Sequence, residues 1–321
     1  MKKSATILVS GGAGYIGSHT VWYLNQLGYR TIVFDNLSTG FRQDMLGDVN
    51  RIGDLQNPWD LKRLFLQEPI DAVIHFAANI AVGESVKEPL KYYRNNTVSL
   101  VNLLETMQAS GVKKLVFSST AAVYGNPVLC PISEDAPIAP VNPYGHSKAW
   151  GEQMLRDCAS AYGMDFVALR YFNACGKAPA THLGEKHDPE THLIPLVLDA
   201  VAGRRPPLKV FGNDYNTLDG TCIRDYVHVL DLAQAHELAL QKMGDGGSFS
   251  AFNLGNGQGH SVLEVIRAVE EICQKPVPFE FAARREGDPA VLVASSAKAK
   301  EKLGWKPKFE SLQSIIKTLV Q

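Results

Sequence analysis

The chain has few cysteines, almost no net charge and no long hydrophobic run. Its five cysteines are odd in number and never in C-x-x-C spacing, so we expect neither a disulfide framework nor a metal site. Lys and Arg number 32 against 33 acids, which indicates neither nucleic acid nor an anionic membrane as a partner. No apolar run reaches membrane-spanning length, and the N-terminus, Met1-Lys2-Lys3, leads into a strand without a signal-peptide pattern. We therefore expect a globular cytoplasmic protein of one or two domains.

A glycine-rich turn follows the first apolar run of the chain. Residues 6–9 are typical of a buried parallel strand, and the apolar residues from Ile16 to Leu27 recur at helical spacing. Between them, Gly11, Gly14 and Gly17 satisfy G-x-x-G-x-x-G. Such glycines let the backbone approach a pyrophosphate at a helix N-terminus. An ordinary glycine turn is the alternative, but the strand and helix on either side favour dinucleotide binding.

An acidic residue ends the next predicted strand, residues 31–34. The carboxylate of Asp35 can accept hydrogen bonds from both hydroxyls of an adenosine ribose, and it would repel a 2′-phosphate. Asn36 and Leu37 offer no compensating cation, so NAD is favoured over NADP. The alternative is that Asp35 only caps a turn, which Asn36 and Ser38 would also suit.

Two further strand ends carry candidate cofactor residues. Asp54 follows a third predicted strand and could reach an adenine amine, or could cap the helix that begins near Pro58. Residues 72–78 form a fourth predicted strand that ends in small side chains, which allow a flat ligand to lie against the backbone. His75, inside that run, is interpreted as a core residue. A helix is predicted from about 88 to 110, with Asn96 at a potential cofactor-facing position.

A tyrosine and a lysine four residues apart follow a fifth predicted strand, residues 115–117. Tyr144 and Lys148 would share one face of a helix. A nearby ammonium and an oxidised nicotinamide ring would both favour the phenolate, which gives a general base that accepts a hydroxyl proton while hydride leaves the same carbon. Thr120, at the end of the strand, could donate a second hydrogen bond to that oxygen. An isolated Y-x-x-x-K is more often a surface pair, but here it follows a complete dinucleotide-binding pattern.

Over essentially its whole length the chain resembles the extended short-chain dehydrogenase/reductases, and within them the sugar-nucleotide 4-epimerases. The early motifs mark the superfamily, and the late ones are more particular to 4-epimerases. The motifs that carry the resemblance are Gly11-Gly12-Ala13-Gly14-Tyr15-Ile16-Gly17, Asp35-Asn36-Leu37-Ser38, His75-Phe76-Ala77-Ala78, Ser118 to Tyr124, Asn142-Pro143-Tyr144-Gly145-His146-Ser147-Lys148, Leu169-Arg170-Tyr171-Phe172-Asn173, Asp219 to Val229 and Arg284-Arg285-Glu286-Gly287-Asp288.

The resemblance implies an α/β fold: a Rossmann-type, doubly wound parallel sheet with a smaller α+β C-terminal substrate domain. Residues 1–172 would bind NAD, with segments near 225–255 returning to that domain, and residues 173–321 would mainly bind the UDP-sugar. A homodimer through the helices near Asn96 and Trp150 is also implied. The cofactor-binding residues implied are Gly11, Gly14, Tyr15, Ile16, Gly17, Asp35, Asn36, Ser38, Asp54, Leu55, Phe76, Ala77, Ala78, Asn96, Ser118, Tyr144, Lys148 and Tyr171.

The implied activity is interconversion of UDP-galactose and UDP-glucose through a 4-keto sugar, in galactose metabolism, with tightly held NAD. Another UDP-sugar, N-acetylated or a pentose, and a non-catalytic NAD-binding sensor are the alternatives. The implied substrate residues are Thr120, Tyr144, Asn173, Leu193, Phe211, Arg224, Arg285, Asp288 and Leu292.

Four positions bear on this interpretation. Ala121 and Ala122 stand where related dehydratases place an acidic pair, which leaves a 4-keto sugar no obvious route except reduction. Ile80 replaces a lysine that contacts the nicotinamide ribose in several family members. Leu292 occupies a place where tyrosine is associated with simple hexoses and small residues with N-acetylhexosamines, so the sugar preference stays open.

Overall fold

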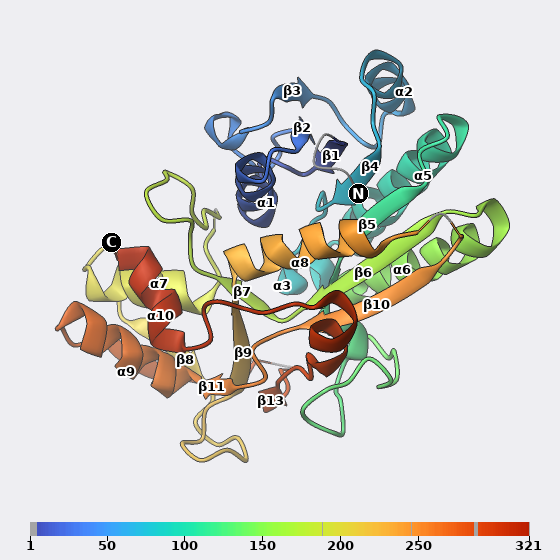
Figure 1. Cartoon of the computed structure of the whole chain (residues 1–321). Coiled ribbons are helices and arrows are strands. Elements are labelled where there is room, and N and C mark those ends of the chain that lie inside the picture. Colours follow the sequence, from blue (N-terminus) through green and yellow to red (C-terminus); the bar gives the residue numbers. More distant parts are fainter. Residues whose placement is uncertain (1–4, 188, 245, 286–287, 321) are drawn as a thin grey trace.

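The computed structural model describes residues 5–187, 189–244, 246–285 and 288–320. The first residues, Met1-Lys2-Lys3, and Glu286 and Gly287 of the Arg284–Asp288 motif lie outside the described residues. The described chain builds one large sheet and two small ones, with helices around them (Figure 1). None of the described helices combines the length and the apolarity needed to cross a bilayer.

The large sheet is parallel throughout and has seven strands. β1 lies inside the sheet, with β2 on one side and β4 on the other, so the strand order reverses beside β1. In an open α/β sheet, ligands bind at the carboxyl ends of the strands next to such a reversal. In spatial order the strands are β10 (Phe249–Leu254), β6 (Asp165–Tyr171), β5 (Lys114–Thr120), β4 (Ala72–His75), β1 (Thr6–Ser10), β2 (Arg30–Asp35) and β3 (Val49–Ile52).

Helices cover both faces of the large sheet, so alternate residues of each central strand are buried on opposite sides. Ile7 and Val9 of β1 face one hydrophobic cluster, and Leu8 faces another. This burial explains why the strands are continuous apolar runs rather than alternating ones. One face is covered by α1 (Tyr15–Gln26) and α8 (Val229–Lys242), and the other by α2 (Pro58–Gln67), α5 (Ser99–Ala109) and α6 (Pro143–Tyr162).

The helix predicted from about 88 to 110 is an almost unbroken helical stretch. It runs through α4 (Pro89–Tyr92), a π-helical turn (Tyr93–Val98) and α5. The short α3 (Val82–Lys87) precedes it. π-helical turns occur frequently at functional sites, and this one contains Asn96.

The later half of the chain builds the two small sheets and their helices. These are β7 (Asn173–Cys175), β9 (Ile223–His228), β11 (Gly259–Ser261) and β13 (Val291–Leu292) in one sheet, β8 (Leu208–Phe211) and β12 (Phe279–Ala282) in the other, with α7 (Leu193–Val201), α9 (Val262–Cys273) and α10 (Leu312–Val320). Figure 1 shows α7, α9 and α10 gathered on the side of the molecule away from α2.

The segments expected to return to the large sheet do so only in part. Phe252–Leu254 lies in β10, which pairs with β6 at the edge of the large sheet. The expectation was wrong for Tyr226–His228, because β9 pairs with β7, β11 and β13 in the small sheet. The chain rejoins the first region only after His228, through α8, whose apolar side packs against α1 and the large sheet.

Candidate active site

The glycine turn between β1 and α1 is built by close backbone contacts. Gly11 has a φ of +74°, and a Cβ there would lie 2.5 Å from the Ala77 nitrogen. A Cβ on Gly17 would lie 2.1 Å from the Gly11 carbonyl oxygen. No L side chain fits at either place without moving backbone, so the glycines let α1 begin directly against the turn. Gly14 immediately precedes α1, and in the part of the chain that the structure describes no side chain caps this end of the helix with a hydrogen bond.

The start of α1 therefore offers a site for an anion. The first N–H groups of a helix have no partner within the helix, and here they belong to Tyr15, Ile16 and Gly17. Among the described residues, no side chain caps them. Backbone N–H groups with a helix dipole behind them are suited to a pyrophosphate. The phenol of Tyr15 leaves this turn and donates a hydrogen bond to the Gly176 carbonyl, 2.5 Å away.

Asp35 lies at the end of β2, beside the glycine turn. One carboxylate oxygen accepts from the Ala13 N–H at 3.0 Å and the other from the Leu37 N–H at 2.8 Å. Burial raises the pKa of Asp35, and these two hydrogen bonds oppose that shift. Asp35 does shape a local turn, as the alternative interpretation held, but each oxygen keeps a lone pair for a ribose hydroxyl. The turn and this carboxylate together fit an NAD molecule.

The predicted adenine side is a short polar loop. The side-chain oxygen of Asn36 accepts from the Ser38 N–H, and its amide donates to Asp54 at 3.2 Å. Asp54 does not cap the helix that starts at Pro58, because Asn57 accepts the Trp59 N–H and serves as the cap. A role for Asp54 toward adenine stays a prediction. The Leu55 side chain is buried in the core, so that residue can offer a ligand only its backbone.

The loop after β4 closes over the glycine turn. Phe76 and Ala77 donate backbone hydrogen bonds to the Ser10 carbonyl, and Ala78 follows without a side chain large enough to fill the space. Asn96 holds the next residue, Asn79, by accepting from its N–H at 2.8 Å and donating to its carbonyl at 3.0 Å. Its other amide hydrogen reaches Ser147. The side chain of Asn96 is therefore committed to positioning this loop.

His75 is the core residue that the sequence predicted. It is 1% exposed and its Nδ1 lies 2.7 Å from the Ser10 hydroxyl. Burial lowers the pKa of His75 to about 3, so the ring is neutral near pH 7. The exposed side chain of Ile80 lies on the loop that follows β4.

Tyr144 and Lys148 lie on α6, one turn apart, at the end of β5. Asn142 caps this helix by accepting the Gly145 N–H at 2.9 Å, and Pro143 is its first residue. Lys148 is 2% exposed and donates to the Ser118 carbonyl at 2.7 Å. Tyr144, Lys148 and the end of β5 are thereby brought together as predicted.

The protonation of this pair differs from the sequence expectation. Burial raises the pKa of Tyr144, and a hydrogen bond with the Thr120 side chain opposes the shift only in part. Lys148 does not supply the expected lowering, because its ammonium is held at the Ser118 carbonyl, and burial lowers its own pKa to about 7. Removing the phenolic proton therefore requires further positive charge next to the ring, which an oxidised nicotinamide would supply.

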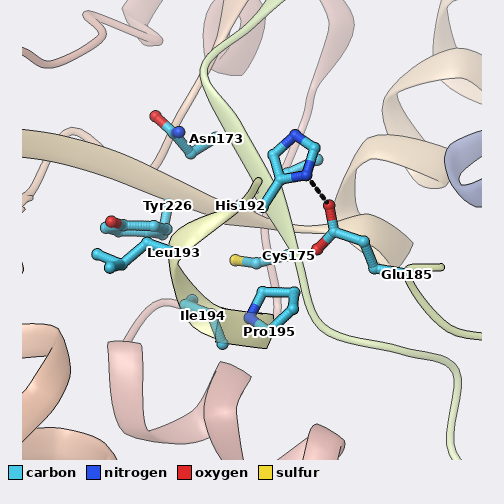
Figure 2. A pocket seen from close by; sticks show the side chains of 9 residues that line it. Asn173, Cys175, Glu185, His192, Leu193, Ile194, Pro195 and Tyr226 are labelled. Atoms are coloured by element: carbon cyan, nitrogen blue, oxygen red, sulfur yellow. Dashed lines mark ion pairs between the residues drawn. The ribbon is translucent and has the colours of Figure 1, made fainter. Parts of the chain in front are cut away.

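A pocket on the other side of the site joins two of the predicted substrate residues. Asn173 and Leu193 both line it, together with Tyr226, Cys175 and His192. Figure 2 shows Leu193 beside Tyr226 and Asn173 above them. Tyr171 precedes this pocket at the end of β6, where its ring lies 5.8 Å from that of His236.

Four of the implied substrate residues from the later part of the chain form two contacts. Arg224 makes an ion pair with Asp288. The guanidinium of Arg285 lies 4.1 Å from the centre of the Phe211 ring. Leu292 pairs in register with Arg224 across β13 and β9, and it packs against a small cluster that includes Phe172. Four of these five side chains therefore contact one another within the protein itself: Arg224 contacts Asp288, and Arg285 contacts Phe211.

Sequence reasoning missed a buried polar network beneath the catalytic strand. Arg170 donates to both oxygens of Glu152, at 2.8 and 2.5 Å. Glu152 accepts from Ser119 at 2.6 Å, and Arg170 also donates to Tyr124 at 2.8 Å. Ser119 lies between Ser118 and Thr120, so the network fixes the strand end that carries both. Glu152 is four residues after Lys148 on α6, which is the signal that could have suggested it.

The large parallel sheet, the glycine turn and the Tyr144–Lys148 pair define an NAD-dependent enzyme that moves hydride and a proton at a hydroxyl-bearing carbon. A model of the NAD dependent epimerase/dehydratase family matches residues 7–255. The chain belongs to this family.

Individual relatives are similar to this chain over nearly its full length. The chain is 52% identical to the UDP-glucose 4-epimerase of Halalkalibacterium halodurans, over 97% of this chain and 93% of the relative. Among solved structures, it is similar to the UDP-glucose 4-epimerase of Brucella ovis in complex with NAD, with a TM-score of 0.95, 47% identity, and coverage of 98% and 97%. It is also similar to the Bifidobacterium longum enzyme in complex with NAD+ and UDP, with a TM-score of 0.93, 39% identity, and coverage of 98% and 96%.

Proposed function

We propose that the protein interconverts UDP-galactose and UDP-glucose by epimerisation at C4, with NAD retained between turnovers. The observation that carries this proposal is the set of Tyr144, Lys148 and Thr120 at the carboxyl end of β5, beside a glycine turn that fits the cofactor. The related enzymes named above support the choice of UDP-hexose.

When bound, NAD would supply the acceptor for the C4 hydride. The first N–H groups of α1 would hold its pyrophosphate, Asp35 would bind its adenosine ribose, and Ser118, Lys148 and Tyr171 would border its nicotinamide end. The positions of these residues at the glycine turn and at the ends of β5 and β6 support the assignments.

Tyr144 takes the proton of the sugar O4 and gives it back. Thr120 shares the hydrogen bond to that oxygen and keeps the phenol in line with it. Lys148, which donates to the Ser118 carbonyl, would hold the end of β5 in place against α6. Ala121 and Ala122 supply no acid or base, so the 4-keto sugar cannot lose water here. The keto-sugar must therefore rotate within the site, so that hydride returns to the other face of C4.

The UDP part of the substrate would lie on the later segments. A guanidinium fork suits a diphosphate, and Arg224 and Arg285 both lie within this part of the site. Asp288 would face the uridine ribose and Phe211 the uracil ring. Asn173 and Leu193 border the sugar from the pocket next to β7.

The test is to incubate the purified protein with UDP-galactose without added NAD and to follow the products by NMR. We expect UDP-glucose to form, and Tyr144→Phe to lower turnover about 10²- to 10⁴-fold, the usual range for loss of a general base. The variant should keep its bound cofactor. If turnover required added NAD in stoichiometric amounts, retention and return of the hydride would be wrong.

A second candidate substrate is an N-acetylated UDP-hexose. Leu292 is partly buried against the cluster of Val123, Tyr124 and Ile132, and its side chain is of intermediate size for the position. The same NMR assay with UDP-N-acetylglucosamine decides between the two sugars by their kcat/KM values.

We also propose that two copies associate through the helical stretch 89–109 and α6. Trp150 of α6 is 48% exposed and stacks on Tyr93 at 4.9 Å, and Leu90, Val98 and Val101 of the helical stretch are also exposed. Sedimentation of the wild-type protein and of Val101→Glu tests this. A dimer that the charged substitution converts to monomer is expected, and a wild-type monomer would contradict it.

A further inference from the structure

Four side chains that could bind a metal ion converge on the segment between β7 and α7. They are Glu185, His187, Glu190 and His192, spaced E-x-H-x-x-E-x-H in the sequence. All their candidate ligand atoms lie within 4.8 Å of one another. The proposed function uses none of them. Figure 2 shows the imidazole of His192 and the carboxylate of Glu185 turned toward each other at the border of the pocket.

The spacing of these atoms suits one tetrahedral ion. Nδ1 of His192 lies 2.9 Å from an oxygen of Glu185 and 2.9 Å from an oxygen of Glu190. Nδ1 of His187 lies 3.6 Å from Glu185 and 3.5 Å from Glu190. With bonds of about 2.0–2.1 Å, the corners of a zinc tetrahedron are about 3.3 Å apart. The four measured separations lie on both sides of that value.

Hydrogen bonding within the cluster explains only half of it. Nδ1 of His192 lies within hydrogen-bond distance of both carboxylates, so the imidazole of His192 can bridge them. His187 is then left over. Its Nδ1 is buried without a hydrogen-bond partner among the described residues, at separations too long for a good hydrogen bond. A divalent cation would occupy all four ligands and neutralise both carboxylates.

We propose that Glu185, His187, Glu190 and His192 bind one divalent cation of the zinc class in a closed, four-ligand site. Four protein ligands leave no open position for a substrate or water, so the ion is structural. The expectation of no metal site rested on cysteine spacing alone, and these ligands are histidines and glutamates.

The ion would fasten a segment that already joins the two parts of the active site. Upstream of the cluster, the Gly176 carbonyl accepts from Tyr15 in the glycine turn. Within it, Lys186 pairs with Asp44 at 3.1 Å, in the loop after β2. Immediately after it, Leu193 begins α7 and lines the pocket. The ion therefore connects the cofactor turn to the substrate side of the site.

Metal analysis of the full-length protein tests the proposal. The protein is dialysed against a strong chelator, reloaded with Zn²⁺, freed of excess metal and measured by mass spectrometry. We expect one equivalent of Zn²⁺ and, after reloading with Co²⁺, the intense visible absorption of a tetrahedral site. His187→Ala and Glu190→Gln should each weaken binding at least about 100-fold.

A matched control comes from the same segment. His182 is an exposed histidine that pairs with Asp44 and takes no part in the cluster. His182→Ala should keep the full equivalent of metal. Chelation should lower the unfolding temperature of the wild type and of this control, but not that of His187→Ala. Substoichiometric zinc in the wild type, or binding that His187→Ala leaves unchanged, would overturn the proposal.

Discussion

The two regions that meet at the site are built from different parts of the chain. The large-sheet region consists of the seven-stranded sheet with α1, α2, α5, α6 and α8. Its cofactor surface is mostly backbone: the glycine turn, the first N–H groups of α1 and the loop held by Asn96. The small-sheet region consists of β7–β9, β11–β13, α7, α9 and α10, and its predicted substrate groups are side chains such as Arg224, Asp288 and Arg285.

This difference indicates which kinds of substitution each region tolerates. A backbone surface depends on close approach, so adding one methyl group can abolish it. A side-chain surface depends on charge and reach, so conservative substitutions should weaken binding in graded steps. Four changes test this contrast, in order of falling effect.

Gly17→Ala should have the largest effect. The added Cβ would lie 2.1 Å from the Gly11 carbonyl oxygen, so α1 must move away from the turn. We expect the purified protein to lose its retained NAD and with it essentially all turnover, measured by absorbance of released nucleotide and by the NMR assay. Gly83→Ala is the control, because a Cβ there meets nothing within 4 Å. A Gly17→Ala protein that kept its cofactor would contradict the claim that cofactor binding depends on close approach of the backbone.

Lowering the pH should have the second-largest effect, because it should destabilise the large-sheet region. Burial lowers the pKa of His19 to about 4, of His75 to about 3 and of His236 to about 4. Because the unfolded rings titrate near 6.5, the unfolded state binds more protons, and stability is lost as pH falls from about 6.5 toward 4. The loss should be on the order of a few kcal/mol.

Urea unfolding at pH 7.5, 6 and 5 measures this loss. Burial also lowers the pKa of His228, at the end of β9, to about 3, so four buried rings contribute to the loss on global unfolding. His236→Gln removes one of them and should flatten the dependence on pH. His182→Gln, on the exposed segment after β7, should leave the slope as it is. Equal slopes for all three proteins would contradict the assignment to buried histidines.

Arg224→Lys should have a moderate effect. The guanidinium donates to the Ile223 carbonyl at 2.7 Å and pairs with Asp288, and an ammonium cannot make both bonds in this geometry. We expect KM for the UDP-sugar to rise about tenfold with little change in kcat, because the lost contact is to a part of the substrate remote from C4. Arg204→Lys, in an exposed pair with Asp199, should change neither constant.

Leu292→Ala should have the smallest effect. Removing the side chain opens space beside the cluster of Val123, Tyr124 and Ile132 and leaves Tyr144, Lys148 and Thr120 unchanged. The ratio of kcat/KM for UDP-N-acetylglucosamine to that for UDP-glucose should rise up to about tenfold, the order of one or two buried methylene groups. Leu218→Ala, fully exposed, is the control and should leave the ratio unchanged. A fall in the ratio would show that Leu292 does not border the sugar.

The sequence predicted the parts of the site that depend on local order along the chain. The structure has the glycine turn before α1, Asp35 as the last residue of β2, and Tyr144 and Lys148 one turn apart on α6, because each of these features depends on neighbouring residues. Their roles toward cofactor and substrate stay predictions. The direction of a side chain is not local in this way. Lys148 turns toward the Ser118 carbonyl rather than the Tyr144 phenol, and no spacing rule specifies that choice.

Pairings between distant strands were also beyond the sequence. The apolar run 226–228 fits a buried strand of either sheet, and only the packed structure places it beside β7. At the helix near Pro58, both Asp54 and Asn57 are good caps by type, and the turn geometry selects Asn57. The Glu152–Arg170 pair joins residues 18 apart through a fold that brings α6 against β6.

The position of β10 at the edge of the large sheet has a consequence for how the protein is made. β6 ends at residue 171, but its partner comes 78 residues later and begins at residue 249. While the ribosome adds that interval, β6 presents an unpaired apolar edge, a template for pairing with other chains. A nascent chain stopped at residue 172 would hold every predicted NAD contact and still lack α8 and β10. The large sheet is therefore completed only after the chain has already added β7, α7, β8 and β9 of the small-sheet region.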